Sequence, residues 1–279
     1  MYVLRFPRDA LALARLRVEE RVTAGLRGRV SLRIPDTRVV ELGADLPSFA
    51  LHEMIPGRDW FDLGLKALPA AAGSLLALDL AWLICQTHSV PLETAGEWLG
   101  LETREPGWRG HLAARDGKPS WFAGEMLEEI RRRLASTIPQ DLAPVFEDVA
   151  DHYDRLTVSV DDLAFGHGDL HGGNLAFAED GVSPRLVGVF DFENAGIFDC
   201  HYDFARLNLI YDELQDRVLD EYARLVPDRP LDRARVETYT RAFLFYLLAE
   251  QVDEGRFEHM VRLLRTHVRH YDSRARAAS

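Results

Sequence analysis

The chain has 279 residues, of which 47% are hydrophobic and 28% are charged, and its formal net charge is −12. This composition is typical of a globular protein, and the negative charge argues against nucleic acid as a partner, because neutralising phosphates requires clustered lysine and arginine. No uninterrupted apolar run reaches the length of about eighteen residues that spans a bilayer, and the two cysteines suggest no disulfide framework. We therefore expect a cytoplasmic protein without a membrane partner.

The first part of the chain, residues 1–57, predicts a small mixed unit. The order is strand, helix, strand and strand, with the elements at Tyr2–Phe6, Ala10–Leu26, Thr37–Leu42 and Ser48–Ile55. Pro7 ends the first strand, because proline lacks the N–H that a strand ladder needs, and Pro56 and Gly57 close the last one.

The remaining part, residues 58–279, is predicted to be mainly helical because its apolar residues recur at helical spacing. The expected helices are Leu68–His88, Gly124–Ser136, Leu142–Leu156, Phe204–Leu225, Leu231–Gln251 and Phe257–Tyr271. No internal repeat or low-complexity linker divides this region.

Two polar loops in the middle of the chain carry the strongest chemical signal. The first is Phe165–Asn174, which reads FGHGDLHGGN, and the second is Gly188–Glu193, which reads GVFDFE. A lone Asp or Asn in a glycine-rich loop usually serves turn geometry. Here Asp169, Asn174 and Asp191 occur in the order that phosphoryl transfer requires: a carboxylate to orient a hydroxyl, and then oxygen ligands for Mg²⁺.

This pattern resembles the catalytic and metal-binding loops of the aminoglycoside phosphotransferase/choline kinase family. The resemblance implies an α+β, bilobal, protein-kinase-like fold, with a truncated β-rich N-lobe at 1–57 and a mainly helical C-lobe at 58–279. It also implies that Asp169 is catalytic, that Asn174 and Asp191 bind Mg²⁺, and that His167 supports the loop.

The resemblance extends to the nucleotide side. Arg5 matches the third-strand cation that contacts nucleotide phosphates, and Glu19 is its expected helix partner, with Glu20 as the alternative. The carbonyl of Glu53 and the amide of Ile55 match the hinge groups that hold the base of ATP or GTP. Backbone contacts leave no side-chain signature, so the choice between the two nucleotides stays open.

Downstream, Asp199 and Asp203 match an acidic segment of the same family. Because Asp203 opens an apolar helical run, we expect both carboxylates to cap a helix or brace a loop rather than to bind a metal. Asp203 is accordingly predicted to give structural support.

One departure concerns the start of the chain. Kinase-like N-lobes place a phosphate-covering hairpin before the strand of Arg5, which requires two strands of about five or six residues each. Only Met1–Leu4 precede Arg5. The sequence predicts either a longer active form, which the upstream reading frame would reveal, or loss of this cover, with an exposed sheet edge and weaker nucleotide binding.

Other reaction classes fit less well. A metallophosphoesterase requires Gly-Asn-His and further Gly-Asp blocks, which the chain lacks. A zinc site from His167, Asp169 and His171 is conceivable but has no further ligand cluster nearby. The phosphate loop of P-loop enzymes and the Gly-x-Ser-x-Gly elbow of α/β-hydrolases are missing from the sequence.

The sequence therefore predicts an ATP- or GTP-dependent O-phosphotransferase that acts on a small-molecule hydroxyl. An aminoglycoside is the first candidate acceptor, and a macrolide or choline-like metabolite is the alternative. Asp212, Glu213 and Asp216 either attract a polycation or form an ordinary solvated helix face. A non-catalytic, pseudokinase-like binding protein is the competing class.

Overall fold

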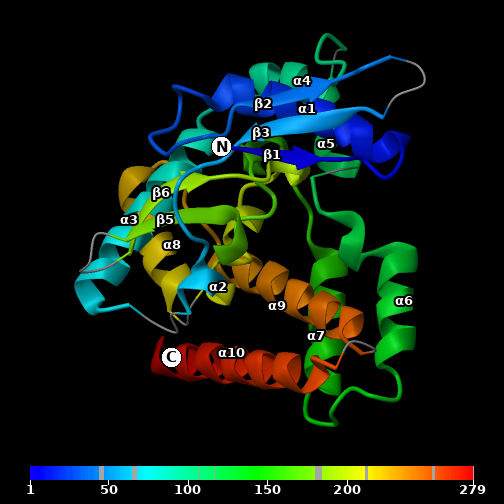
Figure 1. Ribbon diagram of the computed structural model, residues 1–279. Coiled ribbons are helices and arrows are strands. Elements are labelled where there is room, and N and C mark those ends of the chain that lie inside the picture. Colours follow the sequence, from blue (N-terminus) through cyan, green and yellow to red (C-terminus); the bar gives the residue numbers. More distant parts are fainter. Residues whose placement is uncertain are drawn as a thin grey trace.

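The computed structural model shows an α+β protein with a small antiparallel sheet at the N-terminal end and a mostly helical remainder (Figure 1). This confirms the predicted fold class. The structure describes residues 1–43, 47–64, 68–105, 107–115, 117–179, 184–210, 213–252 and 255–278.

The N-terminal sheet has the strand order β1-β3-β2. Its strands are β1 (Tyr2–Arg5), β2 (Thr37–Val40) and β3 (Phe49–Glu53). Helix α1 (Ala10–Leu26) packs against β2 and has the predicted bounds, because the Asp9 side chain caps its first turn by accepting a hydrogen bond from the amide of Ala12. All four predicted elements are present. In the part of the chain that the structure describes, β1 pairs only with β3, so it forms the expected sheet edge.

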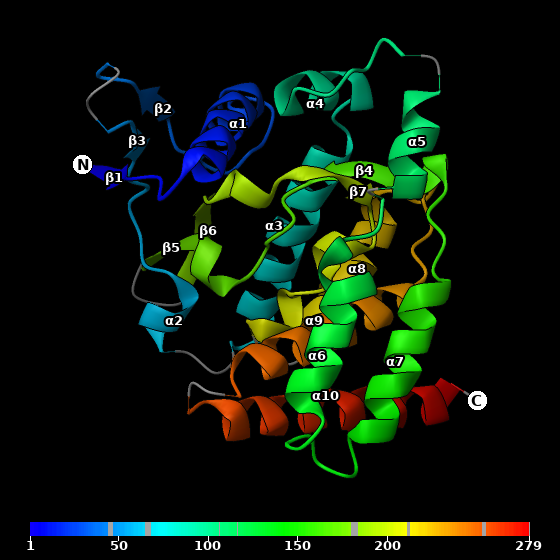
Figure 2. The same cartoon turned by 90° about the vertical axis from the view of Figure 1, so that its right-hand side faces the viewer.

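Two further antiparallel strand pairs follow in the chain. They pair β4 (Leu163–Gly166) with β7 (Gly196–Asp199), and β5 (Leu175–Glu179) with β6 (Pro184–Val189). In Figure 2 the β5–β6 pair lies below the N-terminal sheet, while the β4–β7 pair lies beside α5 (Trp108–Arg115). The segment after β3 is tied to β5, since the amide and carbonyl of Arg58 exchange hydrogen bonds with those of Phe177. This connection continues into α2 (Trp60–Leu63).

Helix α3 (Ala70–His88) is the central helix and packs against α8 (Leu214–Leu225), β4 and β6. Within the described residues it is the one helix long and apolar enough to cross a membrane, and half of its apolar window is buried inside the protein. Fully buried Leu80 and Ala81 belong to its packed face. Because core helices of globular proteins share this composition, the burial accounts for the apolar run.

The outer helices form a second hydrophobic cluster rich in aromatic side chains. They are α6 (Gly124–Leu134), α7 (Ala143–Arg155), α9 (Arg233–Glu250) and α10 (Phe257–Ala278). Phe122, Phe146 and Phe245 pack edge to face with their neighbours, at ring-centroid separations of 5.1 to 6.1 Å. Figure 1 shows α10 crossing beneath α9 at the base of the molecule.

A single helix was predicted over Phe204–Leu225, and this prediction is wrong for the first part of the range. Residues Tyr202–Phe204 and Leu207–Leu209 form 3₁₀ turns instead, and α8 starts only at Leu214. The Gln215 side chain donates to the carbonyl of Phe204, at 2.8 Å, and so satisfies a group that a continuous helix would have bonded itself. The short helices α4 (Leu92–Leu99) and α5 (Trp108–Arg115) were not predicted.

Candidate active site

The first polar loop leaves β4 through a glycine that no other residue can replace without strain. Gly168 has φ of 73°, in the left-handed region that L side chains rarely adopt. A Cβ there would collide with the carbonyl oxygen of Asn194. The glycine therefore lets the loop that carries Asp169 approach the loop that carries Asp191.

Asp203 holds this loop from below. Its buried carboxylate accepts hydrogen bonds from the amides of His167, at 3.1 Å, and Gly168, at 2.8 Å. Nε2 of His88 lies 3.4 Å from the same carboxylate, a contact that is electrostatic because it lacks hydrogen-bond geometry. Burial acts to raise the pKa of Asp203, but His88 and the amide of Gly168 outweigh it and hold that pKa below its ordinary value.

Both ring nitrogens of His167 form hydrogen bonds with the surrounding backbone. Its Nε2 donates to the carbonyl of Phe190, at 3.0 Å, and its Nδ1 accepts from the amide of Asp169, at 3.2 Å. Burial lowers the pKa of this histidine, so the neutral ring is favoured. With both nitrogens engaged, His167 has no lone pair for zinc, and the alternative zinc site loses a ligand.

Asp169 projects from the loop with its carboxylate about one-fifth exposed. Arg206 forms an ion pair with it, Nδ2 of Asn194 lies 3.4 Å from Oδ2, and Nε2 of His171 lies 3.5 Å from Oδ1. Arg206 and Asn194 were not predicted as site residues. Arg206 lies three residues after Asp203, and Asn194 lies three residues after Asp191. Both belong to turns, and the sequence does not show toward which side of a turn a side chain points.

Asn174 and Asp191 lie on neighbouring backbone segments. The carbonyl of Asn174 accepts from the amide of Phe190, at 3.0 Å, so Asn174 is paired with the residue just before Asp191. The Asn174 side-chain nitrogen donates to the carbonyl of Asp169, at 2.9 Å, which leaves its amide oxygen for another partner. Asp191 is a non-glycine residue with φ of 64°, a conformation that usually needs a local constraint.

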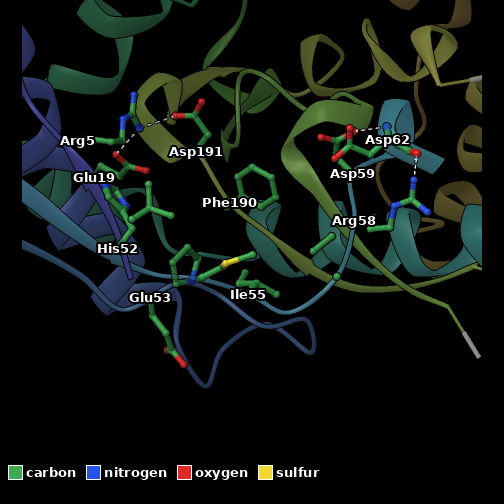
Figure 3. A pocket seen from close by; sticks show the side chains of 15 residues that line it. Arg5, Glu19, His52, Glu53, Ile55, Arg58, Asp59, Asp62, Phe190 and Asp191 are labelled. Atoms are coloured by element: carbon green, nitrogen blue, oxygen red, sulfur yellow. Dashed lines mark hydrogen bonds and ion pairs between the residues drawn. The ribbon is translucent and has the colours of Figure 1, made fainter. Parts of the chain in front are cut away.

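Arg5 connects the N-terminal sheet to the second loop, as Figure 3 shows. Its guanidinium contacts three carboxylates: Glu19 at 3.3 Å, Asp191 at 3.0 Å and Glu193 at 2.7 Å. Glu19 also accepts from the amide of Phe192, at 3.1 Å, so it holds both the cation and the loop. The alternative partner, Glu20, instead accepts from the amide of Val39 in β2.

A cleft of about 480 Å³ opens beside this group. Glu53 and Ile55 line it together with Arg5, Glu19 and Asp191. The Glu53 side chain points away from the cleft, toward Arg33 at 3.4 Å, so its backbone is the part that faces the cavity (Figure 3).

His52 lines the same cleft and was not predicted as a site residue. Its Nδ1 contacts the hydroxyl of Thr37, at 3.2 Å, and its Nε2 is buried without a hydrogen-bond partner. Burial, and then the charge of Arg5, lower its pKa and favour the neutral ring.

A second cavity, of about 640 Å³, lies on the other side of the loops and is lined by Asp169, His171, Asn194 and Arg206. The turn Asp191–Asn194 separates the two cavities, since Asp191 lines the first and Asn194 lines the second.

Comparison with known proteins decides the family. The model of the "phosphotransferase enzyme family" matches residues 1–236. This chain belongs to that family. The predicted resemblance is therefore confirmed, and the protein is a small-molecule phosphotransferase that uses a hydroxyl as acceptor.

Solved structures agree on the kinase-like fold of this phosphotransferase. The GDP complex of aminoglycoside 2'-phosphotransferase-IIIa is 19% identical, with a TM-score of 0.66 over 95% of this chain and 85% of the other. Macrolide 2'-phosphotransferase MphH from Brachybacterium faecium is 23% identical, with a TM-score of 0.59 over 94% and 84%. A streptomycin–ATP complex of APH(2")-IIa is 17% identical, with a TM-score of 0.55 over 96% and 84%. A search of curated protein sequences finds no match.

The phosphotransferase also contains a compact group formed by Asp199, Cys200 and His201, whose potential ligand atoms lie within 4.8 Å of one another. The ring of His201 is already engaged: Nδ1 contacts Asp199 at 2.6 Å, and Nε2 accepts from the amide of Asp232. Asp199 additionally accepts from Arg235 and Tyr239 at the start of α9. These contacts brace β7 against α9, in line with the bracing role expected of Asp199.

Glu19 gives the phosphotransferase a testable pH dependence. Burial raises the pKa of its carboxyl to about 7, against the opposing charge of Arg5, while Asp191 and Glu193 add to the rise. The folded state thus binds a proton that the unfolded chain, with a Glu pKa of about 4.3, has lost. Stability from this group is present below the unfolded value and is lost as pH rises through about 7, a total loss of about 3–4 kcal/mol.

We therefore expect the free energy of unfolding of wild-type protein to fall across this interval relative to Glu19→Gln, measured by urea denaturation in EDTA. Glu20→Gln is the matched control, because the Glu20 carboxylate accepts a hydrogen bond from the backbone of β2 rather than pairing with Arg5. If Glu19→Gln and wild type have parallel pH profiles, the assignment to Glu19 is wrong.

Proposed function

We propose that this protein transfers the γ-phosphoryl group of ATP or GTP to a hydroxyl of a small molecule. The observation that carries the proposal is the turn Asp191–Asn194. It sends Asp191 into the cleft beside Arg5 and sends Asn194 to Asp169 in the second cavity. A nucleotide in the first cavity and an acceptor in the second would thus meet at this turn.

Asp169 is proposed as the catalytic carboxylate. It orients the acceptor hydroxyl and takes its proton, while the hydroxyl oxygen forms a bond to the γ-phosphorus and the bond from that phosphorus to the β-γ bridging oxygen breaks, which releases ADP or GDP. Arg206 and Asn194 hold the carboxylate in place. This positioning matters because phosphoryl transfer depends mainly on geometry and charge stabilisation.

Mg²⁺ fits the oxygen atoms that Asn174 and Asp191 offer. The amide nitrogen of Asn174 is bound to the carbonyl of Asp169, which fixes the side chain so that its oxygen is available. Three carboxylates, those of Glu19, Asp191 and Glu193, surround the guanidinium of Arg5, so negative charge exceeds positive charge in this group. When bound, the ion neutralises nucleotide phosphates and draws charge from the leaving oxygen.

On the nucleotide side, Arg5 is proposed to contact phosphate, and Glu19 to hold it in position. The backbone carbonyl of Glu53 and the amide of Ile55 would bind the base, with the neutral ring of His52 supplying one more hydrogen-bonding atom beside it. The nucleotide-bound complexes of structurally similar proteins, with GDP, ATP or ADP, support a nucleotide as the co-substrate.

We also propose that the protein divides into a nucleotide-side lobe, residues 1–57, and a helical lobe, residues 58–279. We further propose that it is located in the cytoplasm.

The acceptor is a small molecule in the cavity of Asp169. Aminoglycoside, macrolide and choline-like acceptors are each compatible with the family, so the charge of that cavity must discriminate among them.

Nucleotide binding offers the first test. With Mg²⁺, ATP or GTP at about 100 times its dissociation constant should stabilise the protein by about 2.7 kcal/mol, which raises the melting temperature by several degrees at about 2–4 °C per kcal/mol. Asp191→Asn should lose the Mg²⁺-dependent part of this rise, and Asp228→Asn, an exposed site, should keep it.

Two results would contradict the proposal. If neither ATP nor GTP raises the melting temperature of the wild-type protein, the first cavity is not a nucleotide-binding cleft. Stabilisation without phosphoryl transfer to any hydroxyl compound would leave the pseudokinase-like binding protein as the better description.

A further inference from the structure

The cavity beside Asp169 has a charge opposite to what a polycationic acceptor needs. Of the described residues that line it, Asp169 is the one carboxylate, and Arg15 and Arg206 are both cations. Recognition of a compound with several ammonium groups requires unpaired acidic side chains, because like charges at close range oppose binding.

The carboxylates around this cavity are already paired with arginines of the protein. Asp169 is bound to Arg206, while Glu193, in the adjoining turn, is bound to Arg5 at 2.7 Å. Glu250, whose charge reaches Tyr246 in the wall, contacts Arg133 at 2.6 Å. A polycation would have to break these pairs.

The acidic residues that the sequence analysis considered for binding a polycation do not line the Asp169 cavity. Glu213 and Asp216 line a separate cavity of about 20 Å³ with His267 and His270. Glu213 contacts Arg217 at 3.2 Å, and Asp216 contacts Arg233 at 3.4 Å. Asp212, the third member, falls outside the described residues.

The wall of the Asp169 cavity is instead apolar and aromatic. Trp121 packs against Phe243 and Tyr246, with ring centroids 5.7 and 5.6 Å away. Its indole N–H donates a hydrogen bond to the hydroxyl of Tyr202, at 3.1 Å. The Trp121 surface in the cavity thus presents carbon rather than a hydrogen-bond donor. Phe61, Leu209 and Leu247 extend this surface.

Of the two cations, Arg15 remains available to a ligand, whereas Arg206 is paired with Asp169. The side chain of Arg15 is exposed on α1, and the structure gives it no ion pair among the described residues. Arg206 lies 4.1 Å above the ring of Phe243, and its Nε is buried without a hydrogen-bond partner.

Resting on the proposed phosphotransferase function, we propose that the acceptor is a hydroxyl-bearing ring compound without positive charge. Its apolar face packs against Trp121 and Tyr246, and any anionic substituent lies toward Arg15. Aminoglycosides and choline-like amines are disfavoured, because their ammonium groups would face the exposed guanidinium of Arg15 and a carboxylate that is already paired with Arg206.

A binding experiment tests the cavity without requiring catalysis. The probe is 8-anilino-1-naphthalenesulfonate, an anionic aromatic dye, titrated into the full-length protein by fluorescence. We expect Tyr246→Ala, which removes an aromatic surface, to weaken dye binding about tenfold, and Arg15→Glu to weaken it about threefold to tenfold.

The matched control for the charge reversal is Arg262→Glu. Arg262 is exposed on α10 and lies outside the cavity lining, so dye affinity should be unchanged. Kanamycin in millimolar excess should not displace the dye. Unchanged affinity in both cavity variants, or displacement by micromolar kanamycin, would overturn the proposal.

Phosphoryl transfer gives an independent readout. The enzyme is incubated with Mg²⁺, ATP or GTP, and either kanamycin or 4-nitrophenyl β-D-glucoside, an uncharged aromatic glycoside, and products are identified by mass spectrometry. Phosphorylated glucoside with unmodified kanamycin supports the proposal, and phosphorylated kanamycin overturns it. If neither acceptor reacts and nucleotides do not stabilise the protein, the enzymatic function itself fails, while the dye experiment still decides the charge preference of the cavity.

Discussion

Asp169→Asn is expected to lower kcat by about two to four orders of magnitude, the usual contribution of a positioned general base. Asparagine preserves the size of the side chain but cannot accept the hydroxyl proton. It also removes the negative charge that faces Arg206. The loss should appear in kcat more than in KM, because the interaction acts on the reacting hydroxyl rather than on the apolar body of the acceptor.

The folded state should survive this change. Asp169 is partly exposed, and its backbone contacts with His167 and Asn174 do not involve the carboxylate. Asp228→Asn makes the same chemical change at an exposed position and should retain full turnover. A melting temperature close to that of wild type, together with near-normal turnover in Asp169→Asn, would exclude Asp169 as the proton acceptor.

Local sequence patterns were enough to predict the elements whose determinants lie close together in the chain. The helix α1 was predicted from the helical spacing of its apolar residues, and in the structure Asp9 caps its first turn. The family resemblance implied that Arg5 pairs with a helix glutamate, and the helix face that Glu19 shares with the buried Val22 and Leu26 selected Glu19. The roles of the site residues stay predictions, although the geometry places the relevant side chains around two cavities.

Features that depend on distant segments could not be predicted in the same way. The pair between Asp169 and Arg206 joins residues 37 positions apart and depends on the 3₁₀ turns after β7. Helical periodicity continues through these turns, because Phe204 and Leu207 are buried as they would be in a helix. The carbonyl of Phe204 instead accepts a hydrogen bond from the side chain of Gln215, a partner that local periodicity does not reveal.

The acceptor cavity illustrates the same limit. Its aromatic wall combines Trp121, which precedes α6, with Phe243 and Tyr246 of α9. Each aromatic residue alone is typical of a buried helix face. Only their assembly beside Asp169 distinguishes a cavity that favours uncharged rings from one that favours polycations, and overall net charge, being spread over the whole surface, carries no such information.

Asp203→Asn is expected to destabilise the fold by about 2–4 kcal/mol, because an amide can accept only one of the two backbone hydrogen bonds and turns an N–H donor toward the other. The amides of His167 and Gly168 lie at the base of the catalytic loop, and both donate to the carboxylate of Asp203. At about 2–4 °C per kcal/mol, the melting temperature should fall by roughly 5–15 °C.

The effect should also depend on pH. The pKa of Asp203 lies below its ordinary value in the folded state, so its stabilisation is present above the unfolded pKa of about 3.9 and is lost as pH falls through the lower, folded value. The difference in unfolding free energy between wild type and Asp203→Asn should therefore be largest near neutral pH and shrink in acid. Asp161→Asn, at an exposed position, is the control and should show neither effect.

Turnover separates bracing from a general loss of stability. If Asp203 positions the loop, kcat of the variant should remain reduced at temperatures well below its melting point, where the protein is folded, since a shift of the Gly168 amide displaces Asp169. Stability equal to wild type would show that the carboxylate does not hold the loop. A full kcat in the folded variant would limit Asp203 to stabilising the fold, with no part in placing the catalytic carboxylate.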